Sequence, residues 1–384
     1  MKFIKRFLFG LLVLILAAIL GLYISGNKHV LTAVSNTYLK GTTGPSIDEH
    51  TIFPNRSIDP VQGADWPAGE MKALTEEQKA YHEKYESVAF LVIHKGNVIA
   101  EHYWEDYDEE RISNSFSMSK SIIGLLTGIA IDEGKIQSLN DLTSDYIPEL
   151  KGTDKENISL YHLISMSSGI DWGESYTDPF GFQAKTYYGE DLFETCITFP
   201  AVKKPGTEHL YQGGNTLILA KVVENAVGMP VSDYAEKMVW QKIEATESAL
   251  WNLDEEKGFE KASCCYYATA RDFARFGQLY LCQGNWKGEQ IVSSAWVDES
   301  IKPVNIPNPD GTMATNYGYQ WWLSNYQGMD NYSMRGMQGQ YVIAIPDKEV
   351  VIVRLGRNRP DKLENKERLD FVKYVEMALE LIEN

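Results

Sequence analysis

The sequence predicts an α+β protein in which an antiparallel sheet is flanked by N- and C-terminal helices and carries an inserted, mainly helical subdomain. Two observations predict this class. Strand patterns occur at both ends of the region after residue 70, and helical patterns separated by Gly, Pro and Asp loops fill its middle. We place one domain at residues 71–384, with the sheet parts at about 71–116 and 335–384 and the helical subdomain at about 117–334.

The composition is that of a globular protein with a sizeable core. The chain has 384 residues, of which 44% are hydrophobic and 23% charged, and this excludes disordered and collagen-like classes. The formal net charge is −17. A surface of this sign repels phosphate backbones, so we expect no nucleic-acid partner and interpret the acidity mainly as a contribution to solubility.

Residues 1–26 are predicted to be a transmembrane anchor or a signal segment. Lys2, Lys5 and Arg6 precede an uncharged apolar run at residues 7–24, close to the roughly 20 residues that span a bilayer. Positive charge before the run places the N-terminus in the cytoplasm and the main domain on the extracytoplasmic, periplasmic side. We favour an uncleaved membrane anchor because the run ends in a poor cleavage site. The alternative is a cleaved signal peptide and a secreted protein.

The elements follow in order along the chain. Residues 27–70 are expected to be an irregular linker, because Gly, Pro and Asp punctuate them. Thr75 and Gln78 form a capping box that opens a helix to about Ser87. The apolar residues of 119–133 occupy most of a helix circumference, which is typical of a buried helix. The other predicted strands are Val88–His94 and Val98–Trp104 around Lys95-Gly96-Asn97, Tyr341–Ile345 and Val350–Leu355; the other predicted helices are Leu160–Met166, Thr216–Ala226, Ala270–Leu281 and about 362–382.

Four cysteines are present, Cys196, Cys264, Cys265 and Cys282. An even number permits disulfides outside the cytosol, and buried free thiols are the alternative; the sequence does not determine a pairing. The spacing does not match a zinc site, so no metal is expected.

Ser117 and Lys120 are the candidate catalytic residues. They lie three apart at the start of the predicted buried helix and therefore share one face. A buried ammonium is costly, and a lysine with a lowered pKa can take the proton of a serine hydroxyl. The helix N-terminus adds positive potential where an oxyanion would form. The alternative for Ser117 is a simple helix cap.

Several further motifs occur in a fixed order with this pair. They are Ser117-Met118-Ser119-Lys120-Ser121, Leu163–Gly169, Asp171-Trp172-Gly173-Glu174, Lys204-Pro205-Gly206-Thr207 before Tyr211, Ala268–Gly277 and Tyr317–Trp322. Together they resemble the class C β-lactamase-like serine hydrolases, which include D-alanyl-D-alanine peptidases, esterases and 6-aminohexanoate-dimer-type amide hydrolases. The resemblance covers roughly residues 85–380 and implies the β-lactamase/transpeptidase-like fold.

The resemblance implies a role for each matching residue. Ser117 would be the nucleophile, Lys120 the general base and Tyr211 the proton relay to the leaving group. The backbone amides of Ser117 and Gln340 would form the oxyanion hole, and no cofactor is implied. The implied substrate-binding residues are Gly213, Asn215, Met337, Gly339, Trp172 and Trp321; Tyr187, Tyr188 and Trp322 are further candidates for the pocket wall, with the protein core as the alternative.

Two motifs depart from the family pattern. The second motif, Tyr-x-Asn in the family, reads Tyr211-Gln212-Gly213, and Asn215 is a candidate substitute for the lost amide. The third motif, Lys-Thr-Gly or His-x-Gly in the family, reads Met337-Gln338-Gly339 and lacks the cation that would attract a substrate carboxylate. Arg335 is a nearby candidate for that charge. We interpret the loss as evidence against strong β-lactamase activity.

The predicted function is a serine hydrolase that cleaves an ester or amide bond of a small molecule. Asp171 and Glu174 are candidates for binding an amine-bearing substrate, with a solvated loop as the alternative. Two other functions stay open: a D-amino acid peptidase or β-lactamase acting on cell-wall-like substrates, and a non-catalytic binding protein that retains the fold. The sequence does not name the substrate or the oligomeric state.

Overall fold

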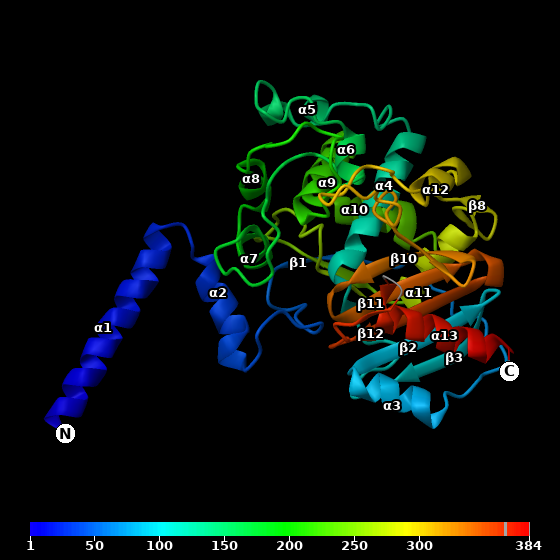
Figure 1. The fold of residues 1–384 in the computed structure, drawn as a ribbon, viewed down its shortest axis with the longest axis horizontal. Helices are drawn as coiled ribbons and strands as arrows, with labels where there is room; N and C mark the ends of the chain where they lie inside the picture. Colours follow the sequence, from blue (N-terminus) through cyan, green and yellow to red (C-terminus); the bar gives the residue numbers. More distant parts are fainter. Residues whose placement is uncertain (365–366, 384) are drawn as a thin grey trace.

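The main sheet joins strands from the two ends of the domain, as the sequence predicts. The computed structural model describes residues 1–364 and 367–383. Its largest sheet has six antiparallel strands in the order β3-β2-β12-β11-β10-β9 (Figure 1). The predicted α+β class is confirmed. The strands are β2 (Ser87–His94), β3 (Asn97–Tyr103), β9 (Trp322–Tyr326), β10 (Met329–Gly336), β11 (Gln340–Ile345) and β12 (Val350–Gly356).

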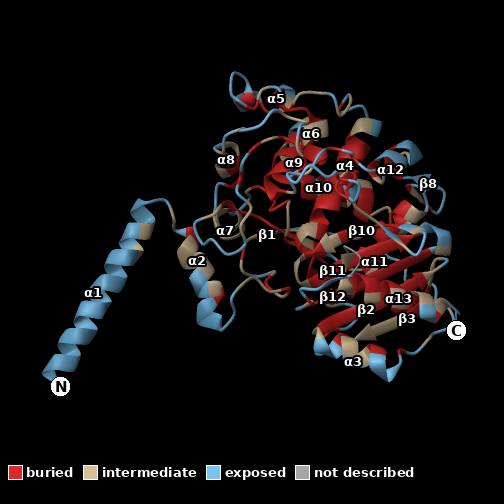
Figure 2. Ribbon diagram, in the orientation of Figure 1, coloured by how far each residue is buried: buried red, intermediate tan, exposed pale blue. Residues whose placement is uncertain are grey.

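Helices cover both faces of this sheet. Alternate residues of a strand point to opposite faces, so Val351 and Val353 of β12 face one layer and Ile352 faces the other. Ile352 packs with α13 (Leu369–Glu383), and α3 (Glu76–Lys84) lies on the edge of the same layer. On the opposite face lie α11 (Ala270–Leu281), which packs on β11 and β12, and α4 (Ser119–Asp132), which contacts β10 and is mostly buried, as Figure 2 shows.

The helical part lies above the sheet in Figure 1 and packs around α4 and α9. Both helices are largely buried: α4 is apolar around most of its circumference, and α9 leaves only a narrow polar stripe at Lys221, Glu224 and Asn225 outside the core. The helices of this part are α5 (Thr143–Tyr146), α6 (Leu160–Ile164), α7 (Phe182–Tyr188), α8 (Leu192–Ile197), α9 (Gly213–Val227), α10 (Val231–Ala235) and α12 (Ser294–Ser300), with short turns η2 (Phe116–Met118), η3 (Pro148–Leu150) and η4 (Glu236–Trp240).

The local sequence signals predicted the start of α3 correctly but not the start of the final helix. The Thr75 hydroxyl accepts from the Gln78 N–H and the Gln78 side chain accepts from the Thr75 N–H, so the predicted capping box is confirmed. The final helix is shorter than predicted. Within the expected range 362–382, the described residues form β13 (Leu363–Glu364) and β14 (Glu367–Arg368) before α13, and residues 365–366 lie outside the described part.

Residues 27–70 are less irregular than expected. They contain α2 (His29–Asn36), η1 (Tyr38–Lys40) and β1 (Asn55–Ile58). The segment Asn55-Arg56-Ser57-Ile58 lacks the apolar alternation that marks a strand, so tertiary pairing decides its conformation. It forms the edge of a second sheet in the order β1-β5-β6-β4. The partners are β5 (Ala249–Asn252), β6 (Tyr266–Ala268) and β4 (Ser113–Asn114).

The hairpin of β9 and β10 lies outside the residues expected to form the sheet. Asn325, Asp330 and Asn331 make these strands polar and hide them from a search for apolar alternation. Gln327 and Gly328 both have positive φ angles, of 51° and 87°, and form the two-residue turn. Residues 322–334, expected in the helical subdomain, therefore belong to the sheet.

The N-terminal helix α1 (Lys2–Ile24) projects from the body of the protein and has no buried residue (Figures 1 and 2). It is long and apolar enough to cross a membrane, a property that a signal sequence shares.

The cysteines have different states. Cys264 and Cys265 form a disulfide, Cys196 is a buried free thiol and Cys282 is an exposed free thiol.

Candidate active site

Ser117 and Lys120 lie where the turn η2 runs into helix α4. The Lys120 Nζ atom donates a hydrogen bond to Ser117 Oγ at 3.0 Å and a second one to the backbone carbonyl of Ser263 at 2.7 Å. The helical spacing of three residues therefore brings amine and hydroxyl together, and a segment distant in sequence fixes the amine from the other side.

The turn before Ser117 is held in an uncommon conformation. Phe116 has a φ of +43°, and its N–H donates to the Asn114 side chain. The end of strand β10 presses against this turn, since a Cβ on Gly336 would lie 2.3 Å from the Ser115 carbonyl oxygen. Only glycine allows the strand to approach so closely, and the approach brings the residue after Gly336 next to the Ser117 turn.

Lys120 is a buried amine, with a side chain only 3% exposed. Burial lowers its pKa from the ordinary value to about 8, while the carboxylate of Glu174 acts in the opposite direction. Among the described residues, Lys120 donates to a hydroxyl and a backbone carbonyl and not to a carboxylate. A sizeable fraction of this amine is therefore neutral near pH 8.

Tyr211 completes the group around Lys120. The centre of its ring lies 5.3 Å from Lys120 Nζ, and the ring packs against Tyr317 and Trp322. Burial raises the pKa of Tyr211, and a hydrogen bond with Ser117 acts against that shift. The phenol therefore stays protonated at neutral pH and is able to donate a proton.

Glu174 lies behind this group and is not a free amine-binding residue. Its carboxylate accepts a hydrogen bond from the Tyr176 hydroxyl at 2.6 Å and another from the Gly213 N–H at 2.8 Å. Burial raises the pKa of Glu174 and the nearby Lys120 lowers it. Asp171 is exposed and lies at a separate small pocket, so the structure does not bring the two carboxylates together.

The group opens into a cleft of about 1800 Å³. Ser117 and Tyr211 lie on its wall with Trp322 and Met337. The charged residues of the wall are mainly acidic: Asp310, Asp330, Asp361, Glu364, Glu367 and Glu376 against Arg335, Arg359 and Arg368. In the described part of the chain, no cluster of three His, Cys, Asp or Glu side chains could hold a metal ion.

The structure corrects the assignment of the second oxyanion donor. The Gln340 N–H already donates to the Met337 carbonyl, and Gln340 is fully buried in the ladder of β10 and β11. Gly339 is also buried and neither residue lines the cleft. Met337, which follows Gly336, does line it. Gly336 and Met337, at the end of β10, therefore occupy the place at the cleft that the sequence assigns to Gly339 and Gln340.

The structure also corrects two predicted wall residues. Trp172 and Trp321 are each 1% exposed and belong to the core. The indole N–H of Trp172 donates to the Cys196 carbonyl, and the ring of Trp321 packs against that of Tyr280 at a tilt. The neighbouring Trp322 takes the place at the cleft. Aromatic residues fill both positions, so sequence alone did not separate core from wall.

The other candidates are not among the described residues that line the cleft. Tyr187 and Tyr188 pack against Phe53. The N–H of Gly213 is bonded to Glu174. Asn215 is 1% exposed and lines the separate small pocket, so it does not replace the lost amide of the second motif.

Two arginines decide the charge near the third motif. Arg335 forms a bidentate ion pair with Glu367, with N–O distances of 2.6 and 3.0 Å, so its charge is neutralised. Arg359 lines the cleft and was missed in the sequence. Arg359 follows β12. In the sheet, β12 pairs with β11, which pairs with β10, so the strand order places Arg359 near the third motif.

Comparisons with known proteins agree with this architecture. The Beta-lactamase family model matches residues 72–373. The chain is similar to the 6-aminohexanoate-dimer hydrolase of Paenarthrobacter ureafaciens, with 29% identity over 79% of this chain and 82% of that protein. Among solved structures, it is similar to a provisionally named 6-aminohexanoate-dimer hydrolase from Bacillus anthracis, with a TM-score of 0.77, 22% identity, and coverage of 88% of this chain and 94% of that chain.

A family VIII carboxylesterase has the same fold, with a TM-score of 0.56, 16% identity, and coverage of 79% of this chain and 96% of that chain. The family model spans most of the domain that carries the Ser117 and Lys120 pair, and the hydrolase homologue supports hydrolase activity. The chain therefore belongs to the Beta-lactamase family.

Proposed function

We propose that this chain is a serine hydrolase that cleaves an ester or amide bond through an acyl-enzyme on Ser117. The contact that carries the proposal is the 3.0 Å hydrogen bond between Lys120 Nζ and Ser117 Oγ, in a place where burial lowers the lysine pKa to about 8. A neutral amine at hydrogen-bond distance is able to accept the hydroxyl proton.

The reaction proceeds in two halves. Lys120 takes the Ser117 proton while the Ser117 oxygen attacks the acyl carbon of the substrate. Tyr211 gives its proton to the departing alcohol or amine, and Lys120 returns a proton to Tyr211. Water then attacks the acyl-enzyme through the same groups in reverse, which releases the acid and restores the Ser117 hydroxyl.

The oxyanion of each tetrahedral intermediate needs two donors. We assign them to the backbone N–H groups of Ser117 and Met337, because Gly336 presses against the turn before Ser117 and Met337 lines the cleft. Removing one such donor typically costs about 2.7–4 kcal/mol of barrier.

The charge of the wall favours a neutral or cationic ester or amide. Carboxylates are the more common charged group there, and Arg335 is neutralised by Glu367. The relative's name, 6-aminohexanoate-dimer hydrolase, suggests short linear amides as a substrate class for this chain as well. A D-amino acid peptidase or β-lactamase is the second candidate, and Arg359 is the observation that favours it, since it places a cation in the cleft.

A substrate panel separates these candidates. The full chain in detergent is tested with p-nitrophenyl esters, short amides and a chromogenic cephalosporin, beside the Ser117→Ala variant. We expect hydrolysis of esters and short amides that is lost in the variant. Cephalosporin turnover that exceeds ester turnover would replace the first candidate with the second. A lack of turnover on every substrate would favour a binding protein.

Turnover is expected to rise with pH through about pH 8. Protonated Lys120 cannot accept the Ser117 proton, so activity requires the neutral amine that forms above its pKa of about 8. The measurement is kcat/KM for an ester without ionisable groups. A rise in kcat/KM centred near the usual histidine pKa of about 6.5 would contradict the assignment of Lys120 as the base.

The substitution Met337→Lys is expected to shift specificity toward carboxylate-bearing esters. Met337 lines the cleft beside the proposed oxyanion site, so an added ammonium can bind a substrate carboxylate there. We expect the ratio of kcat/KM for a carboxylate-bearing ester to that for its neutral analogue to rise about tenfold, since a charged hydrogen bond contributes about 1.5–3 kcal/mol. Met313→Lys is the matched control, because Met313 lines the cleft elsewhere. Equal ratios in the two variants would show that residue 337 is not next to the acyl group.

We also propose that α1 anchors the domain to a membrane, with the domain on the extracytoplasmic side. Lys2, Lys5 and Arg6 precede the apolar stretch, which supports this orientation, and α1 has no buried residue, so its apolar surface is available to a membrane. Partition of the full chain into the membrane fraction, and its accessibility to protease from the outer side, test the assignment.

A further inference from the structure

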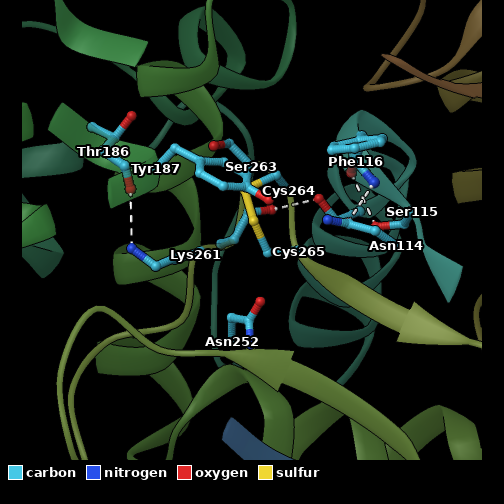
Figure 3. The surroundings of a disulfide bond; sticks show 12 residues. Asn114, Ser115, Phe116, Thr186, Tyr187, Asn252, Lys261, Ser263, Cys264 and Cys265 are labelled. Carbon is cyan, nitrogen blue, oxygen red and sulfur yellow. Dashed lines mark hydrogen bonds between the residues drawn. A yellow bond between two sulfur atoms is a disulfide. The ribbon is translucent and has the colours of Figure 1, made fainter. Parts of the chain in front are cut away.

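A disulfide between adjacent residues lies directly behind the proposed catalytic amine. Cys264 and Cys265 are bonded to each other, with Cα atoms 3.8 Å apart, in the loop that leads into β6 (Figure 3). Cys265 has a φ of +66°, in the left-handed region that side chains rarely adopt. The bond closes a small ring that includes the peptide between the two residues, so it restricts the torsions of both.

The residues just before this disulfide contact the first turn of α4. The Ser263 carbonyl accepts the 2.7 Å hydrogen bond from Lys120 Nζ, and the Ala262 carbonyl accepts one from the Ser119 hydroxyl at 3.0 Å. Ser263 is therefore one of two partners that fix the amine, the other being Ser117. A shift of this carbonyl would move the amine relative to Ser117.

Hydrogen bonds hold the residues on either side of Ser263. The Cys264 N–H donates to the Lys261 carbonyl, the Asn252 N–H to the Cys265 carbonyl, and the Trp251 indole to the Cys264 carbonyl. These bonds hold the residues on either side, and the disulfide constrains the loop immediately after Ser263 (Figure 3). Cys264 is partly exposed, so a small reductant can reach the bond.

We propose that the Cys264–Cys265 disulfide is a redox-sensitive positioning element that holds the Ser263 carbonyl against Lys120, so that its reduction lowers turnover. The inference rests on the proposed function of Ser117 and Lys120. A dithiol reductant supplies two electrons and two protons, the S–S bond breaks, and two thiols form while the reductant becomes a cyclic disulfide. The reduced loop no longer fixes Ser263.

Reduction affects the chemical step more than substrate binding. The disulfide does not line the cleft, so KM is expected to change little. The amine loses a fixed partner, and kcat is expected to fall between about 10-fold and 100-fold, as for a small misplacement of a catalytic group. Greater access of water to Lys120 also moves the acid limb of the pH profile to higher pH. Glu174 and Tyr211, the other titratable groups that face Lys120, are untouched.

The test uses the full chain in detergent. Ester turnover and its pH profile are measured for oxidised protein, for protein reduced with dithiothreitol, and after reoxidation, while mass spectrometry after alkylation counts the thiols. The Cys264→Ala, Cys265→Ala double variant is expected to have the lower kcat of the reduced protein and no response to dithiothreitol. Cys282→Ser is the control for the exposed free thiol and should respond as the wild type does.

A reversible fall in kcat with an unchanged KM and a shifted acid limb supports the inference. Unchanged turnover after complete reduction overturns it. Unfolding on reduction, seen in circular dichroism, also overturns it, because the bond would then be a general structural constraint. Failure of the proposed function looks different: the oxidised wild type itself would show no turnover and no labelling by a fluorophosphonate, and the inference would fall with it.

Discussion

Replacing Ser117 with alanine is expected to reduce ester turnover at least about 10⁴-fold, since the variant lacks the oxygen that forms the acyl-enzyme. The loss falls on kcat rather than on KM, because the cleft and both proposed oxyanion donors stay in place. The fold is expected to survive, since the hydroxyl is bonded only to Lys120 and Tyr211 in the described part of the chain. The measurement is steady-state hydrolysis with a thermal unfolding curve.

Ser121→Ala is the matched control. Ser121 lies one turn further along α4, is buried, and donates to the Gln320 carbonyl at 2.6 Å, away from the cleft. This variant should keep most of the turnover although it also loses a hydroxyl from the same helix. Equal losses in the two variants would mean that the helix, and not the nucleophile, had been damaged.

Replacing Lys120 with methionine is expected to reduce turnover at least about 10³-fold without loss of stability. Without the amine, the hydrogen-bond partner left to Ser117 in the described part of the chain is the protonated phenol of Tyr211, which does not act as a base at neutral pH. Methionine has a similar volume and carries no charge, so the substitution also removes the cost of burying the amine. The expected signature is therefore a large fall in kcat with an unchanged or higher unfolding temperature.

Lys261→Met tests whether any buried lysine gives the same result. Lys261 is 1% exposed, and burial lowers its pKa to about 8, like that of Lys120. Its amine donates to the Thr186 and Gly189 carbonyls and not to Ser117. We expect this variant to retain turnover of the wild-type order. A loss as large as that of Lys120→Met would contradict the specific role of Lys120.

The sequence was most informative where a charged residue occurs among apolar ones that are expected to be buried. A lysine in the first turn of an otherwise apolar helix predicted the contact between Lys120 and Ser117, and the structure shows that contact. Periodicity predicted the central hairpin and the buried helix, because both depend on local apolar patterns. The catalytic roles of Ser117 and Lys120 are proposals, and the hydrogen bond that those roles require is present.

The remaining features depend on tertiary contacts that leave no local pattern. The Ser263 carbonyl is a backbone group, and only the fold brings it to Lys120. The sequence assigns the glycine of the third motif to Gly339 and does not single out Gly336, because the close approach of Gly336 to the Ser115 carbonyl becomes visible only in three dimensions. The sequence also could not predict that Cys264 pairs with Cys265, because cysteine spacing alone does not determine disulfide connectivity.

A fluorophosphonate probe reports on the proposed nucleophile itself. The full chain is incubated with the probe near pH 8, digested, and mapped by peptide mass spectrometry. We predict a single adduct on Ser117 that disappears in Ser117→Ala and forms far more slowly in Lys120→Met. An adduct on another residue, or no adduct on a protein that hydrolyses esters, would show that Ser117 is not the nucleophile.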